Sequence, residues 1–206
     1  MIKAIAFDLD GVLVDACDWH KDALNLALRD FGQPEIDDLA HKNIYNALTT
    51  KTKLEKLGVP VDLRSQIEEK KQVYTRSLIE KYCHYDDALV KILWLLKQDG
   101  YKLSCVTNSS EDTAKMMLRK CGVLPLLDLV VTNTFGGLPK PNGDPYAYCA
   151  KKFDLQPNQV LAVEDSYKGI ESARRAGCRL LEVASRHSVS YQKIKECVYN
   201  DQQFLF

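Results

Sequence analysis

Six polar residues follow apolar runs of the kind that form buried strands, and a lysine lies in a loop after a further run. They are Asp8, Asp10, Thr107, Asn108, Glu164, Asp165 and Lys140. Carboxylates can act as nucleophiles, as general acids and bases, and as oxygen ligands of a divalent cation. A lysine beside them supplies a fixed positive charge, and a hydroxyl or an amide can donate hydrogen bonds to an anion. Together these residue types could form a ligand-binding or catalytic site.

The elements that must position these residues follow from the hydrophobic pattern. Strands are predicted at 3–8, 101–106, 127–132, 160–163 and 179–183, and helices at 88–97, 111–120, 146–153 and 167–176. Gly100, Gly122 and Gly177 end three of these helices, and Trp94 is expected in the core. Strands that alternate with helices predict a parallel sheet covered on both faces. Ligands of such sheets bind beyond the carboxyl ends of the strands, so the polar residues are expected to converge there.

Residues 15–83 have a different pattern, which predicts a helical insert. Trp19, Leu24 and Leu28 recur at helical spacing before Gly32, and Gly58 and Pro60 separate this stretch from a longer helix. No strand candidate occurs in the segment. The sequence therefore predicts two domains, a core made of residues 1–14 and 84–206 and an inserted helical domain at 15–83.

Composition excludes several classes of protein. The 28 basic residues equal the 28 acidic ones, so the basic excess of a nucleic-acid binder is missing. The apolar run at 92–96 is far shorter than the roughly 20 residues that cross a bilayer. Acidic residues near the N-terminus and seven scattered cysteines without a C-x-x-C pair predict a protein with reduced thiols. We expect a cytoplasmic protein, a monomer or a weak dimer, that binds neither nucleic acid nor membranes.

Four segments resemble, in order, the motifs of the haloacid dehalogenase (HAD) superfamily. They are FDLDGVLVD, CVTNSS, PKPNGDPY and AVEDSYKGIESARRAGC. The chain is similar over nearly its whole length to the branch of sugar-phosphate phosphatases and β-phosphoglucomutase-like proteins. The resemblance implies an α/β fold, a Rossmann-like three-layer core with strand order 5-4-1-2-3. It also implies that the insert is a helical C1 cap and that the chemistry is Mg²⁺-dependent phosphoryl transfer.

The resemblance assigns roles to the carboxylates. Asp8 matches the nucleophile that forms an aspartyl phosphate, and Asp10 matches the general acid and base. The Asp8 side chain, the backbone carbonyl of Asp10 and the Asp165 side chain match the Mg²⁺ ligands, and Glu164 is expected to order a water ligand. Gly11 allows a sharp turn after these acids.

The phosphate-binding residues also come from the resemblance. Thr107 and the backbone amide of Asn108 match donors to phosphate oxygens, and Lys140 matches the lysine beside the nucleophile. This chain departs from the family around that lysine. Pro139 stands where the family usually has glycine, and Asn142-Gly143 stands where it often has Ala-Pro or His-Pro. The departure leaves the path of this loop open.

The helical insert contributes candidate substrate contacts. His20 matches a position that many relatives keep as histidine, and the segment at 45–53 matches the substrate-specificity loop. The candidates are His20, Asn46, Thr49, Thr50 and Lys51. The alternative interpretation is a surface histidine followed by an ordinary connection between helices.

The favoured function is a Mg²⁺-dependent phosphomonoesterase that acts on a small phosphorylated metabolite, with a sugar phosphate as the first choice. A phosphomutase would return the phosphoryl group to the substrate and would need basic cap residues. The matching loop offers Lys51 and Lys53 but no arginine, and Ala16 replaces a hydroxyl residue common in that branch. A catalytically idle HAD-fold regulator is disfavoured because Asp8, Asp10 and Asp165 are all present.

Overall fold

Five short apolar segments pair into one parallel sheet. A computed structural model describes residues 1–45 and 48–200 of the chain. The strands are β1 (Ala4–Phe7), β2 (Lys102–Val106), β3 (Leu129–Val131), β4 (Val160–Glu164) and β5 (Arg179–Glu182). They lie in the order β3-β2-β1-β4-β5 with every pairing parallel. This is the predicted strand order read from the opposite edge, and the predicted α/β fold class is confirmed.

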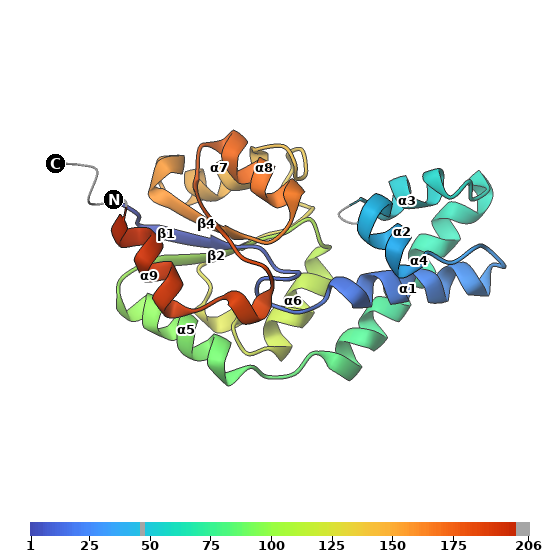
Figure 1. Cartoon of the computed structure of the whole chain (residues 1–206), viewed down its shortest axis with the longest axis horizontal. Helices are drawn as coiled ribbons and strands as arrows, with labels where there is room; N and C mark the ends of the chain where they lie inside the picture. Colours follow the sequence, from blue (N-terminus) through green and yellow to red (C-terminus); the bar gives the residue numbers. More distant parts are fainter. Residues whose placement is uncertain (46–47, 201–206) are drawn as a thin grey trace. The chain divides into compact units, whose positions relative to one another are not determined.

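Helices cover both faces of the sheet (Figure 1). On one face lie α7 (Asp144–Lys152) and α8 (Tyr167–Ala176), and on the other lie α5 (Asp87–Gln98), α6 (Glu111–Lys120) and α9 (Tyr191–Asn200). Short 3-10 turns at Leu124–Leu126, Pro157–Gln159 and Arg186–Ser188 complete the connections. The core between the sheet and α7 and α8 is made of small and aromatic side chains such as Ala6, Ala162 and Tyr146.

The register of the sheet brings three strand ends to one level. Phe7 of β1 is paired with Cys105 of β2 and with Val163 of β4. The residues that follow these positions therefore come out at the same edge of the sheet. Most side chains buried in these strands are apolar, and the polar residues that follow them gather at this edge.

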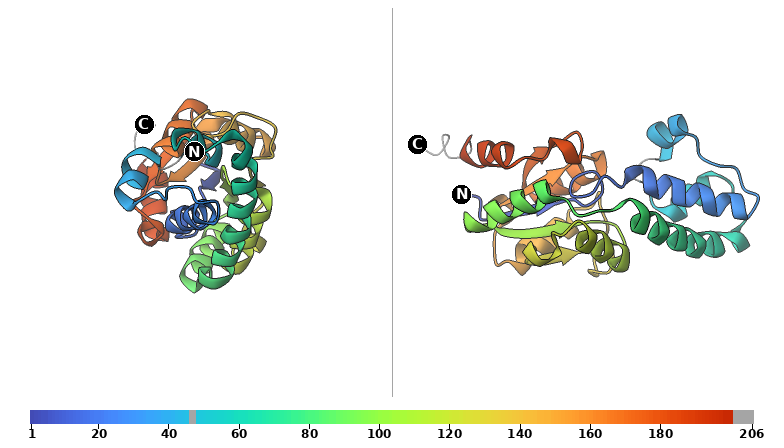
Figure 2. Two further views of the ribbon diagram at one scale, coloured as in Figure 1. Left: turned by 90° about the vertical axis from the view of Figure 1, so that its right-hand side faces the viewer. Right: turned by 90° about the horizontal axis from the view of Figure 1, so that it is seen from below.

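The chain divides into two compact units. The first is Met1–Asp15 with His84–Phe206, and the second is Ala16–Cys83. The second unit consists of α1 (Cys17–Asp30), α2 (Asp38–Ala40), a π-helical turn (His41–Tyr45), α3 (Thr50–Lys56) and α4 (Val61–Tyr82). Figure 2 shows α1 and α4 running side by side. Together with α3 they form a separate apolar core that includes Leu24, Leu54 and Ile67, all fully buried.

The prediction that Trp94 lies in the core is wrong. Trp94 of α5 is 50% exposed. The buried face of α5 is formed by Leu89, Leu93 and Leu96, which repeat at three- and four-residue spacing. A residue directly after Leu93 is turned about 100° away from that face, since an α-helix has 3.6 residues per turn. The apolar stripe of this helix is therefore narrower than its sequence suggests.

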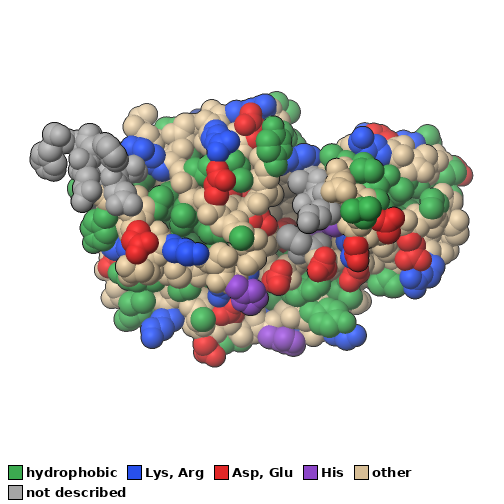
Figure 3. Space-filling view, viewed as in Figure 1, with side chains coloured by type: hydrophobic (Ala, Val, Ile, Leu, Met, Phe, Trp, Pro, Cys, Tyr) green, Lys and Arg blue, Asp and Glu red, His purple; other side chains and the backbone are tan. Residues whose placement is uncertain are grey.

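The surface of the molecule mixes both signs of charge. On the face drawn in Figure 3, Lys and Arg side chains are scattered among Asp and Glu side chains. This distribution agrees with the equal totals of 28 basic and 28 acidic residues. Among residues 1–45 and 48–200, no helix is long and apolar enough to cross a membrane.

Candidate active site

The chain leaves β1 through a tight turn that carries two aspartates, Asp8 and Asp10. The backbone N–H of Asp8 donates to the Val163 carbonyl of β4 over 3.0 Å, which continues the ladder by one residue. Gly11 then adopts a φ of +88°, a conformation that L-residues rarely take. A Cβ added at Gly11 would lie 1.9 Å from Oδ2 of Asp165. Glycine is thus required both for the turn and for the close approach of Asp165.

Lys140 lies at the centre of the site and is 5% exposed. Its Nζ donates to Asp8 Oδ1 over 2.7 Å, to Glu164 Oε1 over 2.5 Å and to the Val106 carbonyl over 2.7 Å. The Asn108 side chain holds the backbone of this lysine from both sides. Its Oδ1 accepts from the Lys140 N–H over 3.0 Å and its Nδ2 donates to the Lys140 carbonyl over 3.1 Å. The loop therefore fixes the ammonium against β1, β2 and β4.

The unusual sequence after this lysine has a structural reason. The Asn142 carbonyl accepts a hydrogen bond from Ser172 Oγ of α8 over 2.5 Å. At Gly143, an added Cβ would lie 2.8 Å from the backbone nitrogen of Ala176, also in α8. Glycine at this position lets the loop pack directly on the helix backbone. With Asn142-Gly143 in this place the loop packs on α8, and Lys140 lies beside Asp8.

Glu164 is fully buried at the end of β4. Its Oε1 accepts from Lys140 and from the Tyr146 hydroxyl, which lies 2.5 Å away. The carboxyl packs flat against α8, because a Cβ added at Gly169 would lie 1.9 Å from Oε2. Oε2 of Glu164 and Oδ1 of Asp165 are buried and accept no hydrogen bond from the described residues. Two carboxylate oxygens of the site are therefore left without a protein donor.

The cluster contains more acidic than basic side chains. One oxygen each of Asp8, Glu164 and Asp165 lie within 4.8 Å of one another, and Lys140 is the cation bonded to this cluster. Burial, and then the charge of Glu164, raises the pKa of Asp8 well above its usual range and the pKa of Asp165 to about 6. Burial opposes the charge on Lys140, but the carboxylates of Asp8 and Glu164 outweigh it and raise its pKa.

A divalent cation would correct this imbalance. Three carboxylates and one ammonium carry a net charge of minus two when all are ionised, and such a deficit matches one divalent ion. The donors are oxygens only, which is the set that hard cations prefer. The two buried oxygens without donors are the further sign that a positive group fits here. The residues of this cluster thus fit a hard divalent cation.

A short chain of hydrogen bonds links the turn after β2 to the turn after β1. Thr107 is buried, and its Oγ1 accepts from the backbone N–H of Ser109 over 3.0 Å. Ser109 Oγ in turn donates to Asp10 Oδ2 over 2.9 Å. The contact of Ser109 with Asp10 is a feature that the sequence analysis missed. The only signal for it is a hydroxyl residue two positions after Thr107.

The structure brings together the predicted residues of the sheet edge. One cluster contains Asp8, Lys140, Glu164 and Asp165. Beside this cluster, Ser109 is hydrogen-bonded to both Asp10 and Thr107. Asn108 reaches the cluster by a route that was not predicted, through its side chain. Tyr146 was also missed, because a tyrosine at a buried helix position ordinarily indicates core packing.

The residues predicted in the insert belong to the second unit. His20 lies on α1, and Thr50 and Lys51 begin α3. Thr49 is the N-cap of α3, where its Oγ1 accepts from the Thr52 N–H over 3.2 Å. This bond gives Thr49 a structural role that is common for N-cap threonines. Asn46 lies outside the described residues.

Comparison with known families decides the assignment. Residues 5–183 match the model of haloacid dehalogenase-like hydrolases, which is most of the chain. The chain belongs to this family. The predictions of the superfamily and of a hydrolase are confirmed, and the order of strands agrees with them.

Individual relatives of this hydrolase are phosphatases. It is 30% identical over 186 residues to a phosphoglycolate phosphatase of Nitrosospira multiformis, which covers 85% of this chain and 80% of that one. It is 27% identical over 188 residues to a phosphorylated carbohydrates phosphatase of Thermotoga maritima, with coverages of 85% and 82%. The solved structure of a β-phosphoglucomutase from Clostridium difficile superposes with a TM-score of 0.82 at 21% identity over 99% of this chain and 100% of that one. This last likeness shows the shared fold.

Proposed function

We propose that this hydrolase removes the phosphoryl group from a small phosphorylated metabolite by way of an aspartyl phosphate on Asp8. The observation that carries the proposal is the contact between Lys140 and Asp8 inside a buried acidic cluster. A lysine at 2.7 Å orients this buried carboxylate and offsets its charge, which supports the role of a nucleophile. The relatives are named as phosphatases of phosphoglycolate and of phosphorylated carbohydrates, which favours sugar phosphates and related small acids as substrates.

The metal of the proposal is Mg²⁺. Asp8, Asp165 and the backbone carbonyl of Asp10 would hold it, with Glu164 beside a water ligand. When bound, it supplies the positive charge that offsets the carboxylates and the transferring phosphate. The donor set of oxygens and the two buried carboxylate oxygens without donors support this choice.

The reaction takes two steps at phosphorus. A carboxylate oxygen of Asp8 forms a bond to phosphorus as the bond to the leaving oxygen breaks, and Asp10 gives that oxygen its proton. The ionised Asp10 then removes a proton from water, which attacks the aspartyl phosphate and releases inorganic phosphate. Lys140 supplies a positive charge beside the transferring group, and the hydroxyl of Thr107 donates to a phosphate oxygen during both steps. Ser109 holds the Asp10 carboxylate through Oδ2.

Substrate selection is assigned to the second unit. In this proposal residues 16–83 act as the cap, and the substrate contacts come from His20, Asn46, Thr49, Thr50 and Lys51. Cap domains of enzymes exclude bulk water and add contacts to the part of the substrate that does not react. Among these five candidate contacts, Lys51 is the one lysine and none is an arginine, which suits a substrate with a single phosphate.

Phosphate release from a panel of small phosphate esters tests the proposal. The panel contains phosphoglycolate, several sugar phosphates and nucleotides, each assayed with Mg²⁺. We expect turnover of at least one small ester by the wild-type enzyme and a loss to background in Asp8→Asn, which is nearly isosteric. Strong phosphate release by Asp8→Asn would contradict the role of Asp8. Accumulation of a sugar bisphosphate in place of phosphate would favour a phosphomutase.

A further inference from the structure

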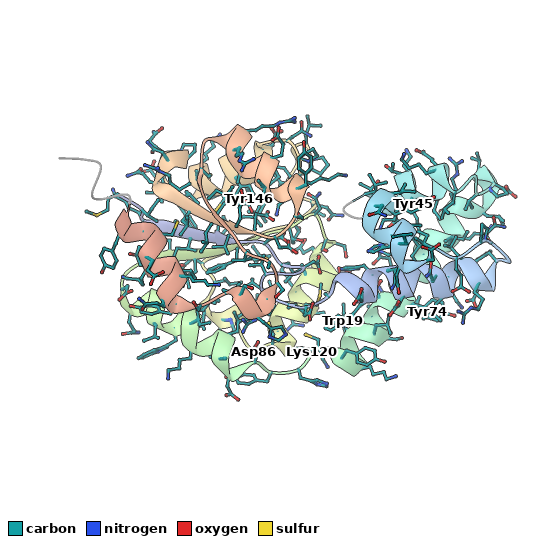
Figure 4. All side chains as sticks on the ribbon, viewed as in Figure 1. Trp19, Tyr45, Tyr74, Asp86, Lys120 and Tyr146 are labelled. Carbon is teal, nitrogen blue, oxygen red and sulfur yellow. The ribbon has the colours of Figure 1, made fainter. Side chains whose placement is uncertain are left out.

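Tyr146 is a fully buried tyrosine whose hydroxyl reaches the active-site cluster. It comes from the first turn of α7, and its ring packs between that helix and the sheet (Figure 4). Its Oη donates to Glu164 Oε1 over 2.5 Å and accepts from Lys140 Nζ over 3.4 Å. The Lys140 ammonium also lies 5.1 Å from the centre of the ring. Phenol, ammonium and carboxylate therefore form a closed triangle.

Packing alone does not explain the hydroxyl. The other buried side chains of α7 are Pro145, Cys149 and Ala150, so the helix otherwise presents an apolar surface. Burying a phenolic O–H without a partner costs roughly 1–3 kcal/mol, and phenylalanine would fill the same space without that cost. The tyrosine is tolerated here because the O–H has an acceptor, and the acceptor is an active-site carboxylate.

The two oxygens of Glu164 differ in the hydrogen bonds that they accept. Oε1 receives both donors, Lys140 and Tyr146, while Oε2 accepts no hydrogen bond from the described residues. A carboxylate held by two donors on one oxygen cannot rotate without breaking both bonds. On its other side the carboxylate lies directly against Gly169 of α8, where an added Cβ would collide with both of its oxygens. The orientation of Oε2 is thus determined by the bonds made to Oε1.

We propose that Tyr146 is a positioning residue of this hydrolase, which acts by holding Glu164 and Lys140 in the geometry that the cation site requires. The proposal rests on the proposed function above, since it concerns the same acidic cluster. Groups that hydrogen-bond the carboxylates around a metal typically contribute about 10- to 100-fold to metal affinity or activity. At Glu164, Tyr146 is the neutral hydrogen-bond donor to the carboxylate and Lys140 is the charged donor.

The test compares two phenylalanine variants on the same helix. Tyr146→Phe removes only the O–H that contacts Glu164. Tyr148→Phe is the matched control, since Tyr148 is also on α7 and its hydroxyl makes no hydrogen bond with residues 1–45 and 48–200. Binding of Mn²⁺ is measured by electron paramagnetic resonance without any substrate, alongside kcat, KM and the melting temperature of each protein.

We expect the Kd for Mn²⁺ to rise about tenfold in Tyr146→Phe and to stay at the wild-type value in Tyr148→Phe. The loss should appear in kcat with little change in the KM of the phosphate ester, because the phenol does not touch the substrate. Equal Mn²⁺ affinity in both variants, with an active wild-type enzyme, would overturn the role of Tyr146 alone. A wild-type protein that neither binds Mn²⁺ nor releases phosphate would instead overturn the proposed function.

Discussion

At the scale of single residues, the site is organised around one ammonium and three carboxylates. Lys140 contacts Asp8 and Glu164 directly, while Asp165 approaches the same cluster over Gly11. Burial makes these charges interact strongly, because less water screens them. The protein therefore holds its own carboxylates in an unfavourable state that a divalent cation relieves. This balance predicts a definite dependence on pH.

Cation affinity should fall as the pH is lowered through about 6, the pKa of Asp165. A proton on this carboxyl must leave before the oxygen can bind a cation, so affinity should drop about tenfold per pH unit below the pKa. The sign for stability follows as well. The pKa of Asp165 is raised from 3.8, so in the metal-free protein its contribution to the free energy of unfolding decreases as the pH rises from 3.8 to about 6.

Calorimetric titration with Mn²⁺ between about pH 5 and about pH 8 measures this dependence. Asp165→Asn is the control, since an amide does not titrate, and its affinity should be weaker overall with a shallower slope. Wild-type affinity that is equal at both ends of this range would contradict the assignment of Asp165 to the cation site.

At the scale of elements, the site exists because strand ends and tight turns coincide. β1, β2 and β4 end at one level, and the turn after β1 brings Gly11 against the carboxylate of Asp165. The order of the strands was implied by the family resemblance. The gathering of Asp8, Lys140 and Asp165 could be predicted from the sequence, because apolar runs typical of buried strands ended at polar residues.

Other contacts could not be predicted, because they depend on how the elements pack. The Tyr146 hydroxyl reaches Glu164 at the end of β4 because α7 packs against β2, β3 and α8. The two hydrogen bonds between the Asn108 side chain and the Lys140 backbone depend on the path of a loop whose sequence departs from the family pattern. Periodicity likewise placed Trp94 in the core, since it does not define the width of a buried stripe on a helix.

Two glycine variants distinguish the effect of the backbone conformation from the effect on the Asp165 carboxyl. Gly11 and Gly100 have nearly equal φ values, +88° and +86°, but only at Gly11 does an added Cβ meet Asp165, whereas Gly100 has no atom within 4 Å of that position. Alanine in this left-handed conformation costs roughly 1–2 kcal/mol of stability at either site. We expect a larger decrease in melting temperature for Gly11→Ala than for Gly100→Ala, because only at Gly11 must the added Cβ also displace the Asp165 carboxyl. Phosphate release should be lost only in Gly11→Ala, and equal activity of the two variants would contradict the account of the turn.

At the scale of the whole molecule, chemistry and selection are assigned to different units. The acidic cluster, Lys140 and Tyr146 all belong to the unit that contains the sheet, and this unit has its own core. The residues proposed to contact the substrate belong to Ala16–Cys83, which has a second core. Separate cores allow the helical unit to vary in sequence without disturbing the sheet edge. The central claim, an aspartyl phosphate on Asp8, therefore concerns the first unit alone.

The most direct measurement of that claim is the mass of the protein after rapid acid quenching of its reaction with p-nitrophenyl phosphate. The Asp10→Ala variant is used, because this leaving group needs little protonation while release of the phosphoryl group to water still needs the base. We predict a burst of nitrophenol and a mass increase of one phosphoryl group, located by peptide mapping on the segment that contains Asp8. Phosphate release without any covalent adduct, or an adduct on another residue, would contradict the account.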